Sequence, residues 1–227
     1  MHRMVARSIA AVVVSLTLIA GTVVAVTVPH RHGADASAAD ANAVSSRAAF
    51  HDAMRQLWED HVTWTRLVIV SAATLPDPLP DLNPTVQRLL RNQDDIGDAI
   101  KPFYGEAAGE ELTRLLREHI TVAADLIFAA KAGDEAQAAA ASTAWYTNAD
   151  EIADFLGAAN PRQWPAGEMR MMMREHLDLT LAEAVARLQG SYDEEIEIYD
   201  EIHAQILHMA DMLSDGIIAE FPARFAR

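Results

Sequence analysis

Three histidines occur in closely similar surroundings at almost equal intervals along the chain. His61 lies in EDHVTWT, His119 in REHITVA and His176 in REHLDLT, so the intervals are 58 and 57 residues. Imidazole can act as a general acid or base, as a hydrogen-bonding group, or as a ligand of a transition metal. An acidic residue precedes each histidine, but neighbours on a helix point about 100° apart. The acids are therefore expected at the edge of any face that the histidines occupy.

A second set of polar residues recurs further along. Asn92, Asn148 and Gln205 come into register when NQDDIGDAI, NADEIADFL and QILHMADML are overlaid, with intervals of 56 and 57 residues. A carboxamide can both donate and accept hydrogen bonds. We expect these side chains near the edge of the core, where they would bind a small ligand or cofactor beside the histidines.

Helices must position both sets of residues. Apolar residues recur at helical spacing, and the chain has no strand-like alternation of any length. The pattern predicts six helices, over residues 47–74, 84–101, 110–132, 135–157, 167–189 and 192–219. Each histidine lies at the centre of the apolar stripe on the first helix of a pair. The sequence therefore predicts an all-α bundle of three antiparallel helical hairpins, related by a pseudo-threefold internal repeat.

Turn and capping residues mark the predicted helix ends. Gly133 in KAGD and Gly190 in LQGS can take the left-handed conformation that closes a helix. Asp134 in DEAQ and Ser191 in SYDE each begin a sequence that resembles a capping box. Asn83 is expected to cap the second helix, just before a proline. The resulting loops are short, which favours antiparallel neighbours.

Two interpretations of the histidine layer, formed by His61, His119 and His176, are open. In the first, each imidazole is a core group that bonds to a carboxamide of the partner helix and to Thr65 or Thr180, because an unpaired buried polar group costs about 1 to 3 kcal/mol. In the second, the three rings converge and hold a transition metal, either zinc, copper or iron, with an open coordination position. Helical periodicity places each histidine towards a core and does not decide between the two.

The first 46 residues have a different character from the rest. Residues 1–28 carry Arg3 and Arg7, followed by an apolar run that is typical of a signal anchor or of a cleaved signal peptide. Residues 29–46 are small and polar and are predicted to be a disordered tether. Residues 47–227 would form the six-helix domain. We therefore expect this domain outside the cytoplasm, held at the cell membrane by the anchor or secreted after cleavage.

Composition excludes several classes of protein. The chain has no cysteine, which excludes disulfides, thiolate metal sites and thiol chemistry. After residue 33 there are 15 basic and 33 acidic residues, a net charge of −18. Such a surface repels phosphate backbones, so nucleic acid is not an expected partner. Glycine-rich nucleotide motifs and the G-x-S-x-G nucleophile motif are also missing from the sequence.

Five phrases occur in order along the helical part of the chain: LWEDHVTWTRLVIVSAA, RLLRNQDDIGDAIKPFYG, EHITVAADLI, WYTNADEIADFL and HMADMLSDGI. Together they resemble a family of bacterial helical-bundle proteins whose members bear inconsistent names, glycosyltransferase and acetylglutamate kinase among them. The resemblance spans residues 50–220 and implies a helical fold. It brings no catalytic residues, substrate or cofactor that could be assigned to positions of this chain.

The sequence thus predicts an extracytoplasmic bundle that binds a metal ion or a small ligand at a layer of histidines and carboxamides. The enzymatic alternative is a metal-dependent oxidoreductase or hydrolase at the same layer, where an open coordination position would activate water or peroxide. A purely structural or partner-binding bundle is the third possibility. The arrangement of the three imidazoles in space distinguishes among these functions.

Overall fold

The computed structural model describes the backbone of residues 34–226 and the side chains from residue 43 onward. Within this range the chain forms six α-helices, one short 3-10 helix and no strand. The elements are α1 (Ala34–Ala73), α2 (Leu82–Tyr104), α3 (Glu106–Ala132), α4 (Glu135–Ala159), α5 (Ala166–Gln189), α6 (Tyr192–Glu220) and η1 (Pro222–Arg224). The predicted all-α fold with six helices is confirmed for these residues.

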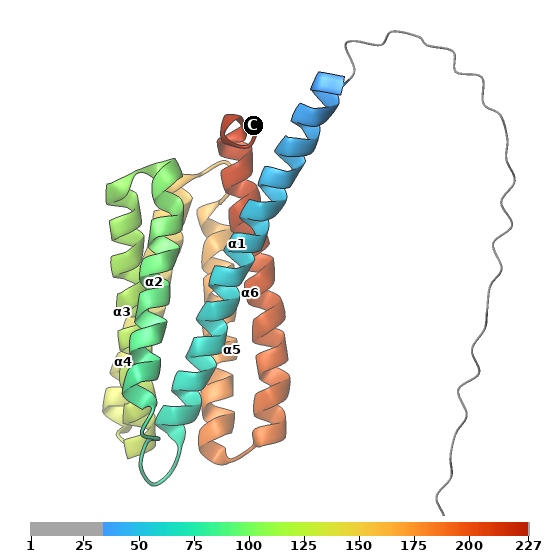
Figure 1. Ribbon diagram of the computed structural model, residues 1–227. Helices are drawn as coiled ribbons and strands as arrows, with labels where there is room; N and C mark the ends of the chain where they lie inside the picture. Colours follow the sequence, from blue (N-terminus) through green and yellow to red (C-terminus); the bar gives the residue numbers. More distant parts are fainter. Residues whose placement is uncertain (1–33, 227) are drawn as a thin grey trace, which may run out of the picture.

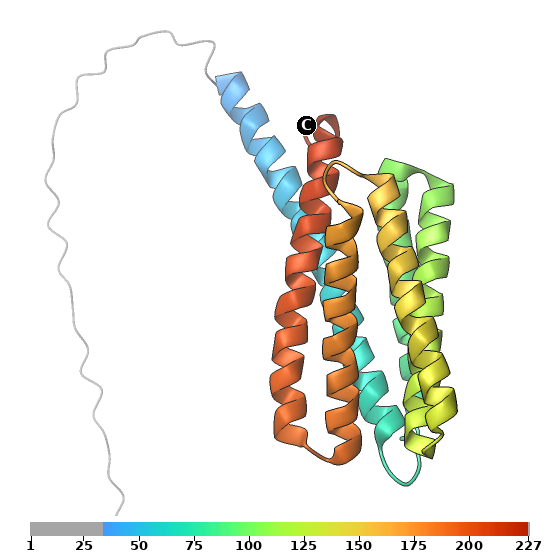
Figure 2. The same ribbon diagram turned by 180° about the vertical axis from the view of Figure 1, so that it is seen from behind.

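Successive helices run in opposite directions along the bundle (Figure 1). The connections after α1, α3 and α5 lie at one end, and those after α2 and α4 lie at the other end with the C-terminus (Figure 2). Each helix packs against the next, and α6 packs against α1, so the six helices close into a ring. Inside this ring α1 also contacts α3 and α5, whereas α3 and α5 have at most marginal contact with each other. Helices α3 and α5 therefore lie apart from each other, and both contact α1.

Two of the predicted turns have the expected geometry. Gly133 ends α3 with a φ of 70° and Gly190 ends α5 with a φ of 76°, both in the left-handed region. Asp134 then caps α4, because its carboxylate accepts a hydrogen bond from the backbone N–H of Gln137 at 3.0 Å. The glycine and the cap together reverse the chain within a few residues.

Two predicted caps are wrong. Ser191 makes no capping hydrogen bond with its side chain at the start of α6. Asn83 lies inside the first turn of α2, and the N-cap position is occupied by Asp81. The Asp81 carboxylate does not cap either, since it accepts a hydrogen bond from Ser71 Oγ at 2.6 Å. Ser71 on α1 therefore binds the carboxylate that could have capped α2.

The first helix begins earlier than predicted, so residues 34–46 of the predicted disordered tether are helical. Six of these thirteen residues are alanine, the strongest helix former, which favours continuation of the helix. Ser46 Oγ donates to the carbonyl of Phe225 at 2.9 Å. The ring of Phe50 packs against that of Phe225 with centroids 5.2 Å apart. In Figure 1 the earliest turns of α1 extend beyond the rest of the bundle.

The predicted signal anchor or signal peptide, residues 1–28, lies outside the described residues. Among residues 34–226, no helix combines the length and the apolar character that crossing a membrane requires.

Burial follows the predicted helical stripes. His61, His119 and His176 are only 3%, 3% and 4% exposed, so the prediction that each faces a core is confirmed. The helices approach most closely where α2 meets α3. A Cβ on Gly97 would lie 2.7 Å from the carbonyl oxygen of Gly109. The absence of a side chain at this position therefore allows the two backbones to meet.

Candidate functional site

Three carboxamides fix the helices that carry the histidines to their neighbours. Each carboxamide nitrogen donates to the backbone carbonyl four residues before a histidine: Asn92 to Leu57 at 2.9 Å, Asn148 to Leu115 at 3.1 Å, and Gln205 to Met172 at 3.1 Å. These bonds join α2 to α1, α4 to α3 and α6 to α5. None of the three carboxamides lines the cavity described below. Their donor groups hold helices together, and the cofactor-binding role predicted for them stays a prediction.

The hydrogen bonds of His119 fix its tautomer. Trp145 Nε1 donates to His119 Nε2 at 3.1 Å, and an indole nitrogen can only donate. His119 Nδ1 lies 2.8 Å from Asn148 Oδ1, which accepts because the amide nitrogen of Asn148 is already bonded to a carbonyl. Nδ1 therefore carries the hydrogen. Both nitrogens of this ring are engaged within the protein.

His61 and His176 have equivalent carboxamide neighbours. The side chain of Gln93 stabilises the protonated form of His61, and that of Gln205 does the same for His176. Gln93 uses both amide hydrogens, on Leu89 O and Asn92 Oδ1, and Gln205 uses one, on Met172 O. Nδ1 of both histidines and Oε1 of both glutamines lack a partner within hydrogen-bonding distance among the described residues. A glutamine that favours the protonated imidazole does so through its oxygen, which can only accept, and we infer from this that Nδ1 carries the hydrogen in both rings.

Gln93 is a site residue that the repeat pattern did not reveal. It is fully buried, it donates to Leu89 O at 2.9 Å, and it also donates to Asn92 Oδ1 at 3.1 Å. In α4 and α6 one carboxamide lies beside both a backbone carbonyl and an imidazole, whereas in α2 Asn92 bonds to the carbonyl and Gln93 lies beside the imidazole. Two adjacent carboxamides in a helix were the only signal in the sequence.

Burial keeps the imidazoles neutral. It lowers the pKa of His119 and of His176 to about 4. Burial also lowers the pKa of His61 well below 6.5, and the neighbouring imidazoles, His176 and then His119, lower it further. At neutral pH the layer therefore presents uncharged rings that can accept hydrogen bonds through Nε2.

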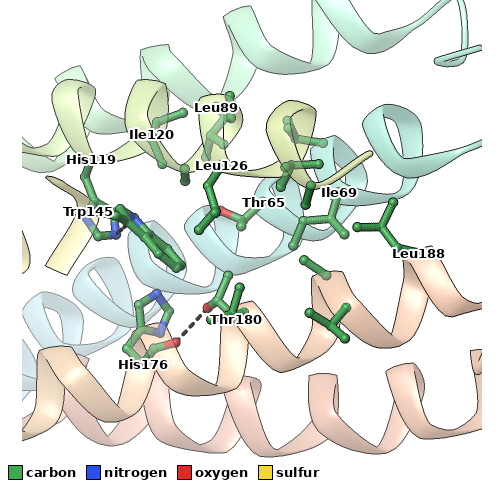
Figure 3. A pocket seen from close by; sticks show the side chains of 18 of the residues that line it. Thr65, Ile69, Leu89, His119, Ile120, Leu126, Trp145, His176, Thr180 and Leu188 are labelled. Atoms are coloured by element: carbon green, nitrogen blue, oxygen red, sulfur yellow. Dashed lines mark hydrogen bonds between the residues drawn. The ribbon is translucent and has the colours of Figure 1, made fainter. Parts of the chain in front are cut away.

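A cavity of about 50 Å³ adjoins the histidine layer. The three histidines, Trp145 and a series of apolar side chains from α1, α2, α3 and α5 line it. In Figure 3 the rings of His119, Trp145 and His176 gather at one end, and apolar residues such as Ile69 and Leu188 extend towards the other. A small lining residue follows each histidine by four positions: Thr65, Ala123 and Thr180. These short side chains leave the space that larger ones would fill.

The two threonines do not bond to the imidazole rings, as one interpretation of the sequence expected. Thr65 Oγ1 donates to the backbone carbonyl of His61 at 2.7 Å. Thr180 Oγ1 donates to that of His176 at 2.8 Å, the bond drawn in Figure 3. Their hydroxyl hydrogens are thus used within their own helices. The cavity receives no free donor from either residue.

The three histidines do not form a metal centre in this arrangement. Nε2 of His119 accepts from Trp145 and has no lone pair left for a metal. Between residues 34 and 226, no three His, Asp or Glu side chains have the geometry to hold a metal ion. The rings of His61 and His176 lie closer together, with centroids 5.8 Å apart. The spacing of the histidines predicted a common position in the fold, and the indole N–H of Trp145 takes the lone pair of His119 that a shared metal would need.

Comparison of the chain with protein-family models, with curated proteins and with solved structures finds no match in any of the three. The geometry of the histidine layer and its cavity is therefore what bears on function.

A separate group of polar side chains, His51, Ser214 and Asp215, lies between α1 and α6, away from the cavity. His51 Nδ1 is 2.6 Å from Ser214 Oγ, and His51 Nε2 is 3.1 Å from Asp215 Oδ1. A serine, a histidine and an aspartate linked in this way resemble a hydrolase triad. Ser214, however, is completely buried, and its hydroxyl also bonds to the carbonyl of Ala210 at 2.8 Å. The cluster therefore joins two helices and has no nucleophile within reach of a substrate.

Buried charges connect α1, α5 and α6 beside the cavity. Arg66 contacts Glu183 at 2.8 Å and Glu195 at 3.0 Å, and Arg187 contacts Glu195 at 3.3 Å. Both glutamates are only 1% exposed. Burial raises the pKa of Glu183 to about 7, although the charge of Arg66 opposes this. These residues pair with one another, and none of them lines the cavity.

Proposed function

We propose that the protein binds a small, predominantly apolar molecule in the cavity between α1, α3 and α5, with the histidine layer at its polar end. The observation that carries this proposal is the cavity itself. Protein interiors are close-packed and seldom contain voids larger than a water molecule. A cavity of about 50 Å³ is several times the 10 to 15 Å³ that one water needs.

The neutral histidines also support a binding function. Burying imidazoles in an apolar core is unfavourable unless they are hydrogen-bonded. A protein that needed only a stable bundle would gain from apolar side chains at these three positions. Ligand sites in helical bundles are commonly built in this way, from a few polar groups on facing helices within an apolar surround.

The enzymatic alternatives have less support. A metal-dependent oxidoreductase or hydrolase would need the lone pair of His119 that Trp145 occupies. The names glycosyltransferase and acetylglutamate kinase, borne by the family that the sequence resembles, imply a nucleotide site. Pockets for molecules of that size usually have volumes of about 300 to 1,000 Å³. We therefore propose binding without catalysis.

We also propose that the bundle consists of three related hairpins, α1–α2, α3–α4 and α5–α6. The support is the carboxamide bond found once in each pair, always to the carbonyl four residues before a histidine. Divergence within such a repeat would explain why Asn92 bonds to the backbone carbonyl while Gln93 lies beside the imidazole.

The proposed location is outside the cytoplasm, with residues 1–28 either retained as an anchor or removed. The apolar run from Ser8 to Val28 and the arginines before it support this location. Membranes from cells that express the full chain should retain it after a high-salt wash, with the domain accessible to external protease. Recovery of the chain only from the cytoplasm would contradict export.

Xenon and n-hexane test the binding site, because both are apolar and carry no hydrogen-bonding group. With the purified full chain, each should raise the midpoint of thermal unfolding, and bound xenon should give a distinct NMR signal. Ala123→Leu, which fills the cavity, should abolish both effects. Ala139→Leu, at an exposed position of α4, is the matched control and should leave them intact. Absence of any effect on the unsubstituted protein would refute the proposed site.

A further inference from the structure

We infer that the ligand is a neutral, single-chain aliphatic molecule whose polar end donates a hydrogen bond, as a primary alcohol does. This inference rests on the proposed function and adds the chemical class of the ligand. It follows from the hydrogen-bonding groups that face the cavity, from their charge, and from the shape of the space.

The donors around the cavity are already used. Trp145 donates to His119, and the hydroxyls of Thr65 and Thr180 donate to backbone carbonyls. Nδ1 of His119 donates to Asn148, and we infer that Nδ1 of His61 and of His176 likewise carries the hydrogen. What is left is Nε2 of His61 and Nε2 of His176, which no described residue bonds to. Because both are acceptors, a ligand must donate in order to form a hydrogen bond here.

Charge narrows the choice further. The residues that line the cavity include no Asp, Glu, Lys or Arg. Glu183, which precedes the lining residue Ala184 on α5, is paired with Arg66. A carboxylate, a phosphate or an ammonium group in this space would be buried without a counter-charge, which is strongly unfavourable. A hydroxyl group is a donor that carries no charge.

Within the protein, Trp145 already binds His119 in the way proposed for the ligand. A neutral N–H group attached to an apolar ring donates to Nε2 at 3.1 Å, within a site that is buried on all sides. His61 and His176 present the same atom in the same tautomer, without a partner. Their rings are 5.8 Å apart, which allows one donor to reach either nitrogen.

The shape of the cavity selects a chain. On α5 the lining runs from His176 to Leu188, about 18 Å at 1.5 Å per residue. A volume of about 50 Å³ spread over that length leaves no width for a ring. Val185, which lines the cavity on α5, is 41% exposed. A linear chain can lie along this space with its head at the imidazoles, whereas a fused ring system cannot.

Three probes of equal chain length test the head group: 1-octanol donates and accepts, methyl octyl ether only accepts, and octanoate is an anion. Titrations of the purified full chain at pH 8 should show 1-octanol binding about tenfold more tightly than the ether, the effect of about one hydrogen bond. Octanoate should bind more weakly than both. Equal binding of alcohol and ether, or preference for octanoate, would overturn the inference.

His176→Leu should remove the preference for the alcohol, to within about twofold, and leave binding of the ether unchanged. His208→Leu, at an exposed position of α6, is the matched control and should keep the preference. If His176→Leu does not fold, nitrogen NMR of the unsubstituted protein decides the question. The Nε2 signals of His61 and His176 should then shift with 1-octanol and not with the ether, and the absence of that difference would refute the inference.

The outcomes distinguish this inference from the proposed function. Binding of xenon and n-hexane without preference for the alcohol would leave the apolar site in place and refute the donor head group. Failure of all apolar probes to bind would refute both. Binding of 2-cyclohexylethanol as tightly as 1-octanol would refute the single-chain shape.

Discussion

His119→Ala is the substitution for which the structure gives the most definite expectation. Removal of the imidazole leaves the indole N–H of Trp145 and Oδ1 of Asn148 without partners inside the bundle. Each orphaned polar group costs about 1 to 3 kcal/mol, and the lost packing adds to this. Water can enter from the adjoining cavity and recover part of the loss. We therefore expect the free energy of unfolding to fall by about 2 to 4 kcal/mol.

Urea denaturation, followed by circular dichroism, measures this change directly, and the slope with urea should stay constant. His208→Ala, at a position outside the core, should change the free energy by less than about 0.5 kcal/mol. Trp145→Phe should be less damaging in the His119→Ala background than alone, because the indole hydrogen bond is already lost there. A loss below about 0.5 kcal/mol for His119→Ala would refute the buried network.

Three further perturbations test other parts of the structure. Burial lowers the pKa values of the histidine layer, two of them to about 4. Below pH 6.5 the unfolded chain therefore binds more protons than the folded protein. The free energy of unfolding should fall as the pH drops from 6.5 towards 4. Glu183, with its pKa raised to about 7, opposes this, so the loss of stability between pH 8 and 5 is smaller than the histidines alone would give. Equal urea midpoints at the two pH values would contradict a net loss. Gly97→Ala should destabilise the protein by more than about 1 kcal/mol, although alanine has the better helix propensity, because the added Cβ would clash with the backbone of α3. At Gly167 an added Cβ would have no neighbour within 4 Å, so Gly167→Ala should be neutral or stabilising in the same assay. Arg66→Met leaves the buried carboxylate of Glu183 unpaired, whereas Glu195 keeps Arg187. It should cost about 3 to 5 kcal/mol at pH 8, with a smaller cost at pH 5, where Glu183 is protonated, and a pH-independent cost would refute the pairing.

The sequence predicted directions around each helix better than contacts between helices. Helical periodicity correctly placed the three histidines in the core, because position around a helix follows from spacing alone. It could not show that the indole of Trp145 would take the lone pair of His119, since that depends on how α3 meets α4. For the same reason the spacing predicted a common register for Asn92, Asn148 and Gln205 but did not predict their partners. Backbone carbonyls accept a hydrogen bond from each of the three carboxamides, and a sequence pattern does not indicate which carbonyl lies nearby.

Local competition explains the remaining differences. Asp134 caps α4 as its neighbours predict, whereas Asp81 is drawn away by Ser71, and this partner belongs to another helix. Gln93 was missed because α2 uses two adjacent carboxamides where α4 and α6 each use one. The link from His51 to Ser214 spans 163 positions, a distance over which no spacing rule applies. The cavity follows from small residues after each histidine, and their effect depends on α3 and α5 lying apart.

Closure of the ring by α6 against α1 has a consequence for the order of folding. Five of the six contacts around the ring join helices that are consecutive in the chain, and such contacts require only short loops to form. The sixth joins the two ends of the domain, for example through Arg55 Nε and Asp211 Oδ1, 2.6 Å apart and 156 positions distant in sequence. Contacts of such long range form late, because the intervening chain must already be ordered. The α1–α6 seam should therefore be the last interface to close, and its amides should exchange with solvent through partial opening more readily than those of α3 and α4.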